Sequence, residues 1–182
     1  MKQKDISSNT QTILLEAAAK VVLDKGVGAL TLDAVALEAG VSKGGLLYHF
    51  PSKNKLIEGM IERLVAEFDS MLEAELAKSN GDWLSAYIRA SFQSNPKLDS
   101  MGSALFAAVA NAPELLQPLR EHYAKWQNKV TETAASPEVG TIIRMAIDGL
   151  WVSDLLDFAP PSSATRKKMM NTLLQLAEKE SL

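Results

Sequence analysis

Apolar residues recur at every third or fourth position along almost the whole chain, the spacing that places them on one face of an α-helix. The first such stretch runs from about 10 to 25, and Gly26 follows as a residue suited to ending a helix. Alternation of apolar and polar residues, which is typical of strands, never persists, and there is no internal repeat. The pattern predicts an all-α protein.

Capping residues and prolines divide the remainder of the chain into further helices. Ser52 is placed to cap a long helix that ends near 79–81, and Asp82 to cap one that stops before Pro96. Ser136, followed by a proline, marks another helix start. The later predicted helices span about 100–111, 118–135, 136–158 and 163–179.

In residues 31–53 two short helices meet at Gly40, where the absence of a Cβ permits a sharp turn. Thr31 and Ser42 are placed to cap them. Few residues of the second helix are needed for the core, so most of them are predicted to face outward: Lys43, Gly44, Gly45, Leu47, Tyr48 and His49. Small, basic and hydrogen-bonding groups on a short helix are typical of a helix that reads the major groove of DNA.

Composition and charge narrow the class of protein. With 182 residues, of which 47% are hydrophobic and 23% charged, the chain is globular rather than disordered. It has no cysteine and two histidines, so we expect no disulfide, no metal site and no cofactor. Signal-peptide and membrane-span patterns are absent, which predicts a cytoplasmic protein with no membrane partner.

The chain has a net charge of −3, and its acidic residues are unevenly distributed. Residues 1–55 hold seven Lys or Arg and five Asp or Glu, whereas residues 56–182 hold twelve and seventeen. A small basic face is sufficient for phosphate contact, and an acidic remainder limits indiscriminate binding to DNA. The charge pattern therefore permits DNA binding.

The order of a first helix, a TxxxVAxxAGVSxG turn beginning at Thr31, the run LLYHFPSK and a long helix resembles the N-terminal domain of the TetR family of bacterial transcriptional regulators. The resemblance covers roughly residues 10–60, and the rest of the chain is similar in helical layout and length. It implies a three-helix head with a helix-turn-helix (residues 1–52), joined by a long helix to a larger helical domain for effector binding and dimerisation (residues 53–182).

The resemblance also implies a mechanism. Members of the family are homodimers whose two heads enter successive major grooves of a palindromic operator in double-stranded DNA, and a small-molecule effector in the larger domain releases the DNA. Gly45 stands where the family commonly has Thr or Ser, and Leu47 where it commonly has Tyr. The expected DNA contacts are Thr31, Ser42, Lys43, Gly44, Gly45, Leu47, Tyr48, His49 and Lys53.

Each of these contacts has a structural alternative. Two glycines in a helix cost roughly 1 kcal/mol each relative to Ala, so Gly44 and Gly45 mark either close approach to DNA or a loosely formed helix start. His49 is either a phosphate contact or a buried structural imidazole. Lys53 is either a phosphate contact or a solvated lysine.

Large aromatic and methionine side chains mixed with alanines suit an adaptable apolar pocket, although aromatic residues at helical spacing are also ordinary core. Asp148 interrupts an apolar run, and it is expected either to bind a polar group of the effector or to pair with Arg144 four residues earlier. The residues predicted to line an effector site are Phe92, Phe106, Asn111, Trp126, Met145, Asp148 and Trp151.

The last two helices carry a broad apolar stripe that would form a four-helix bundle with a second copy, or alternatively an intramolecular core. The residues predicted at this dimer interface are Leu150, Val152, Leu155, Leu156, Met170, Leu173 and Leu174.

The sequence therefore predicts a repressor that a small, largely apolar effector releases from DNA. One alternative is a helical ligand carrier or enzyme, although no catalytic residues are identified, since His49 and His122 lie in different segments without a signature. Another is an activator or architectural DNA-binding protein without an effector.

Overall fold

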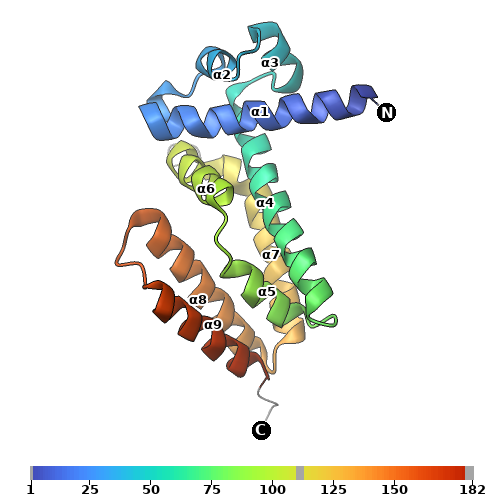
Figure 1. Ribbon diagram of the computed structural model, residues 1–182, viewed down its shortest axis with the longest axis vertical. Coiled ribbons are helices and arrows are strands. Elements are labelled where there is room, and N and C mark those ends of the chain that lie inside the picture. The colour runs from blue at the N-terminus through green and yellow to red at the C-terminus, as the bar shows by residue number, and fades with distance from the viewer. Residues whose placement is uncertain (1, 110–112, 179–182) are drawn as a thin grey trace. The chain divides into compact units, whose positions relative to one another are not determined.

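The computed structural model describes residues 2–109 and 113–178, with side chains from residue 9 onward. Within these ranges the chain is helical and contains no strand. The elements are α1 (Lys2–Lys25), η1 (Val27–Ala29), α2 (Leu32–Glu38), α3 (Lys43–His49), α4 (Lys53–Lys78), α5 (Trp83–Ser91), α6 (Pro96–Val109), η2 (Pro113–Leu116), α7 (Gln117–Thr133), α8 (Pro137–Leu156) and α9 (Ser163–Glu178) (Figure 1).

The all-α prediction is confirmed, with two differences at helix starts. α1 begins well before residue 10, and α6 begins at Pro96 rather than near residue 100. Proline suits the first position of a helix because its fixed φ is already helical and its missing N–H leaves no unpaired donor. Pro96 therefore begins α6, in addition to marking the end of the preceding helical segment.

The chain packs into two compact units. The first is formed by residues 1–65 with 96–119, and the second by residues 66–95 with 120–182. The first unit therefore includes α6, which packs against α1, and the beginning of α4. From the sequence, both segments were predicted to belong to the larger domain, residues 53–182.

In the first unit, α2 and α3 lie beside α1 (Figure 1). Leu14 of α1, Leu46 of α3 and Met60 of α4 are completely buried in its core. The ring of Phe50 covers the backbone of Gly59, where an added Cβ would lie 2.6 Å from it. This close contact fixes the end of α3 on α4.

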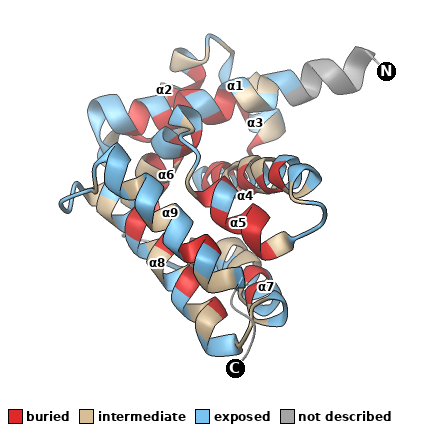
Figure 2. Ribbon diagram, turned by 60° about the horizontal axis from the view of Figure 1, so that its bottom comes forward, coloured by how far each residue is buried: buried red, intermediate tan, exposed pale blue. Residues whose placement is uncertain are grey.

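In the second unit the core is aromatic, and α5 is buried along most of its length (Figure 2). The ring of Phe68 meets those of Tyr87, Trp126 and Trp151 edge-on, at centroid distances of 5.9, 5.0 and 5.5 Å. Edge-to-face contacts of this kind stabilise a core beyond the burial of area alone. α7 and α8 pack closely at Gly140, where an added Cβ would lie 2.7 Å from the carbonyl oxygen of Val130.

Candidate functional site

The turn between α2 and α3 has the form of a helix-turn-helix. Gly40 has a φ of +67°, a left-handed conformation that side chains rarely adopt. The amide of Val41 donates to the carbonyl of Ala36 at 3.0 Å, which closes the end of α2. Thr31 and Ser42 cap the two helices as predicted, accepting from the amides of Ala34 and Gly45 at 3.1 Å.

The exposed surface of α3 carries the side chains expected to face outward. Leu46 is completely buried and holds the helix on the core, whereas Tyr48 is 82% exposed and Leu47 37% exposed. Lys43 and Gly44 are exposed, and Gly45 and His49 are half-buried. Since Leu46 is the one residue within α3 that is buried, most of the helix surface is available to a partner.

The capping hydroxyl groups of Thr31 and Ser42 can still act as hydrogen-bond donors. Thr31 and Ser42 each use the oxygen as an acceptor for their own helix, and both residues are exposed. A hydroxyl that accepts one bond still donates another, so these groups are able to reach phosphate oxygens while they cap.

Lys43 does not stand free on this surface. Its ammonium lies 2.9 Å from Oδ1 and 3.0 Å from Oδ2 of Asp33, in the first turn of α2. Lys53 differs, because it is exposed and forms no ion pair with the side chains that the structure describes. The ring of His49 contacts that of Tyr48 at 5.1 Å, edge-on.

A polar group lies beside the aromatic core of the second unit. Asp148 pairs with Arg144, as their spacing predicted, and Arg144 also donates to the side chain of Gln127. Burial raises the pKa of Asp148, although Arg144 and a hydrogen bond with Tyr123 favour its charged form. Burial likewise raises the pKa of Tyr123, as does the nearby charge of Asp148.

The other residues predicted to line an effector site are distributed over the chain. Trp126 is buried, and Trp151 is half-buried and donates to the carbonyl of Ser91 at 3.3 Å. Phe92 is half-buried at the end of α5. Phe106 is exposed and belongs to the first unit, Met145 is exposed on α8, and Asn111 lies outside the described residues.

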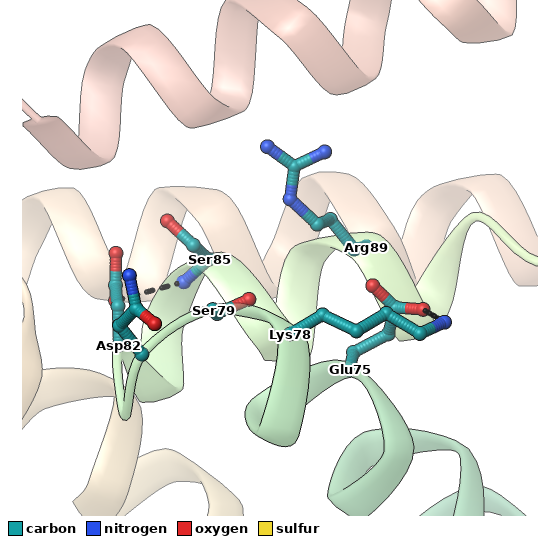
Figure 3. A pocket seen from close by; sticks show the side chains of 7 residues that line it. Glu75, Lys78, Ser79, Asp82, Ser85 and Arg89 are labelled. Atoms are coloured by element: carbon teal, nitrogen blue, oxygen red, sulfur yellow. Dashed lines mark hydrogen bonds and ion pairs between the residues drawn. The ribbon is translucent and has the colours of Figure 1, made fainter.

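A polar hollow of about 390 Å³ lies at the turn between α4 and α5 (Figure 3). Glu75, which is 7% exposed, lines it together with Lys78 and Arg89. Oε1 of Glu75 already accepts from Lys78 and Gln93 at 2.7 Å each. The carboxylate thus has partners within the protein, and no buried side-chain nitrogen or oxygen of the described residues lacks a hydrogen-bond partner.

The apolar residues of α8 divide between two faces. Leu150 is buried within the protomer, as are Leu173 and Leu174 of α9, because α8 and α9 pack on each other and on α5. Leu155, Leu156 and Met170 are half-buried, and Val152 is exposed. The outer face of α8 carries an exposed stripe at helical spacing, formed by Ile142, Met145, Gly149 and Val152.

Two residues of these sites were not found from the sequence. Asp33 contacts the predicted Lys43 across ten positions, and no local pattern signals such a pair. Ile142 on the outer face of α8 had a detectable signal, because it shares the helical spacing of Met145 and Val152.

The described part of the chain contains no cluster of three potential metal ligands and no helix both long and apolar enough to cross a membrane. Residues 14–60 match the family described as bacterial regulatory proteins of the tetR family, and residues 81–178 match the tetracyclin repressor-like C-terminal domain. The chain belongs to the TetR family. Its members are transcriptional regulators rather than enzymes.

The sequence identity to individual members of the TetR family is low. The nucleoid occlusion factor SlmA of Haemophilus ducreyi is 31% identical over 80 residues, 44% of this chain and 40% of that protein. This chain therefore matches about two fifths of the length of that relative. The regulator BetI of Rhizobium meliloti is 29% identical over 82% of this chain and 79% of its own length.

The fold of this TetR chain is shared with solved structures. The multidrug binding protein EbrR, complexed with malachite green, has a TM-score of 0.70 at 20% identity and covers 93% of this chain and 98% of its own. At this identity the likeness concerns the fold alone, and it supports the arrangement of an N-terminal helix-turn-helix and a C-terminal helical domain.

Proposed function

We propose that this chain is a homodimeric, sequence-specific DNA-binding transcriptional regulator, acting as a repressor that a small, largely apolar effector releases from its operator. The observation that carries the proposal is the surface of α3. Leu46 is the one residue within α3 that is buried in the core, and Phe50 holds the end of the helix. The other residues of α3 are exposed or half-buried, with cap hydroxyls at the starts of α2 and α3. Such a helix suits entry into a major groove.

A single head of this size makes few base contacts, so two heads on a palindromic operator supply the required affinity. The exposed stripe of α8 supports a second copy as the partner. Ile142 and Met145 are 57% and 60% exposed, although both are apolar, and Gly149, the next position of the stripe, leaves open space above the helix. Close packing of α8 on its own symmetry mate would bury the stripe.

The aromatic core of the second unit supports an apolar effector. Trp126 and Trp151 meet at Phe68, and Asp148 with Tyr123 offers polar groups beside them. EbrR, which shares the fold, is described in complex with the aromatic dye malachite green. An effector bound here would favour one spacing of the two heads, and release follows if that spacing does not fit adjacent grooves.

A gel-shift assay with the DNA that flanks the coding region of this protein tests the proposal. We expect a retarded complex, and its loss on addition of an aromatic effector would support the repressor. Binding that no tested metabolite or dye changes would favour a DNA-binding protein without an effector. Absence of binding to this DNA, and to duplexes selected from a random library, would favour a helical ligand carrier and overturn the proposal.

A further inference from the structure

The helix-turn-helix has few uncompensated positive charges for a DNA-binding surface. Lys43 is the only Lys or Arg between residues 31 and 50, whereas Asp33 and Glu38 are both acidic. Of the neighbouring lysines, Lys20 pairs with Glu38 and Lys55 pairs with Glu58. Affinity for phosphate depends on Lys and Arg side chains that displace the counterions of DNA, and a lysine held by a carboxylate must first give up that partner.

The pair of Asp33 and Lys43 joins the two helices of the motif. The ammonium of Lys43 is nearly equidistant from both carboxylate oxygens, at 2.9 and 3.0 Å. The side chains are 68% and 58% exposed, so the pair lies on the surface rather than in the core. Two anionic oxygens about 3 Å from an ammonium are also what a DNA phosphate presents. A phosphate bound to the ammonium of Lys43 would therefore have to take the place of the carboxylate of Asp33.

We propose that Asp33 is an internal competitor of DNA. In the free protein its carboxylate holds the ammonium of Lys43, and this contact must be exchanged for a phosphate oxygen when α3 enters the groove. The exchange lowers the affinity for every duplex, whatever its sequence, and limits binding outside the operator. The inference rests on the proposed DNA-binding function and adds a residue that tunes it.

Glu38 provides a matched control on the same helix. It carries the same charge as Asp33, but its carboxylate pairs with Lys20 of α1 and not with a residue of α3. Its replacement changes the net charge of the head equally without freeing Lys43. A difference between the two replacements therefore measures the specific pair rather than general repulsion between acids and DNA.

The experiment measures affinity by fluorescence anisotropy for an operator selected from random duplexes and for a scrambled duplex, between about 50 and 200 mM salt. The variants are D33N, K43Q, the double variant, and E38Q. We expect D33N to bind both duplexes about threefold more tightly per head, since an exposed ion pair is lost. The slope of log affinity against log salt should steepen, by at most about 0.9 per head, because in the wild type the released carboxylate of Asp33 takes up a cation that offsets one of those released from DNA.

The double variant distinguishes an effect of the Asp33–Lys43 ion pair from a general effect of removing one negative charge. We expect the replacement of Asp33 to have no effect on affinity or salt slope when residue 43 is Gln, and E38Q to change both less than D33N. Weaker binding by D33N, an equal gain in the K43Q background, or an E38Q effect as large as that of D33N would overturn the inference. Thermal melting checks that each variant folds, and Asp33→Ser serves as a second variant that removes the charge.

The outcome also separates this inference from the proposed function. If the wild-type protein binds no duplex, the DNA-binding proposal fails. If the wild-type protein binds and D33N leaves affinity and salt slope unchanged, the function stands and the role of Asp33 is refuted.

Discussion

The hydroxyl of Ser42 accepts the amide hydrogen of Gly45 at 3.1 Å, and a Cβ added to Gly45 would lie 3.3 Å from the same oxygen. At the preceding residue the situation differs. A Cβ on Gly44 would meet no atom within 4 Å, and its backbone is not in the left-handed region. The fold therefore has no need for glycine at 44, and we interpret the space as room for DNA.

We predict that Gly44→Ala stabilises the protein by about 0.5 kcal/mol, because Ala favours the helix, and weakens operator binding roughly tenfold by keeping the DNA backbone at a distance. Gly45→Ala should gain less stability because its Cβ crowds the hydroxyl of Ser42. Thermal melting and anisotropy titrations provide the two measurements. If G44A is more stable and binds the operator as tightly as the wild type, close approach at this residue is excluded.

Leu47 is the apolar side chain that α3 exposes beside the open space at Gly44, three residues earlier. The 5-methyl group of thymine is the apolar group that base pairs present in the major groove. We predict that replacing one contacted thymine with deoxyuridine weakens binding about fourfold, the value of one buried methyl group. Each thymine of the selected operator is replaced in turn and the affinity is measured.

The Leu47→Ala variant completes the test as a double-mutant cycle. In this variant the deoxyuridine at the contacted position should have no effect, because the methyl group has lost its partner. Equal sensitivity of the wild type and L47A at every thymine would show that Leu47 does not read a methyl group.

Local signals explain what could be predicted from the sequence. The caps at Thr31, Ser42 and Ser136 and the turn at Gly40 depend on residues within a few positions of each other, and the structure confirms them. The partner of Lys43 could not be predicted in this way. Asp33 lies on another helix, and which surface lysine an acid meets depends on how the helices pack.

Which face of α8 packs into the core was equally hard to predict. Apolar residues occur all around this helix, so periodicity alone did not separate Leu150, which is buried, from Met145, which is exposed. Packing against α9 and α5 determines the buried face. Phe106 illustrates the same limit, since it was predicted to line an effector site and the structure exposes it in the first unit.

Lys53 is an exposed lysine without an ion pair to the described side chains. We predict that Lys53→Ala weakens binding to all duplexes similarly and reduces the salt slope by about one per head, as expected for a phosphate contact. Lys55 is a matched control on the same helix, because it pairs with Glu58, and K55A should have a smaller effect. A loss confined to the operator sequence would argue that Lys53 contacts bases instead.

The exposed stripe on α8 predicts which substitutions separate the dimer. Met145→Arg or Ile142→Arg should give a monomer in sedimentation at micromolar concentration, because each buries a charge against the second copy. Phe158→Arg is the control, since Phe158 is 66% exposed but follows α8 and lies outside the stripe. A dimer that survives M145R and I142R would place the interface elsewhere.

Asp148 and Glu138, both on α8, should affect stability with opposite dependence on pH. Burial raises the pKa of Asp148 above its usual value of 3.8, so the folded state holds this proton more tightly than the unfolded state. Its contribution to the free energy of unfolding is therefore present below pH 4 and is lost as pH rises through the folded pKa. The backbone amide of Glu138 and the hydroxyl of Ser136 lower the pKa of Glu138, so its contribution is lost as pH falls.

We predict that the stability of the wild type relative to D148N decreases as pH rises from about 4 to 7, whereas its stability relative to E138Q is constant over that range and decreases as pH falls below the ordinary glutamate value of 4.5. Urea unfolding of the three proteins at several pH values gives both differences, and the titration of all shared groups cancels in each. A wild-type advantage over D148N that grows with pH would mean that the ion pair with Arg144 outweighs burial and that the pKa of Asp148 is lowered in the folded protein.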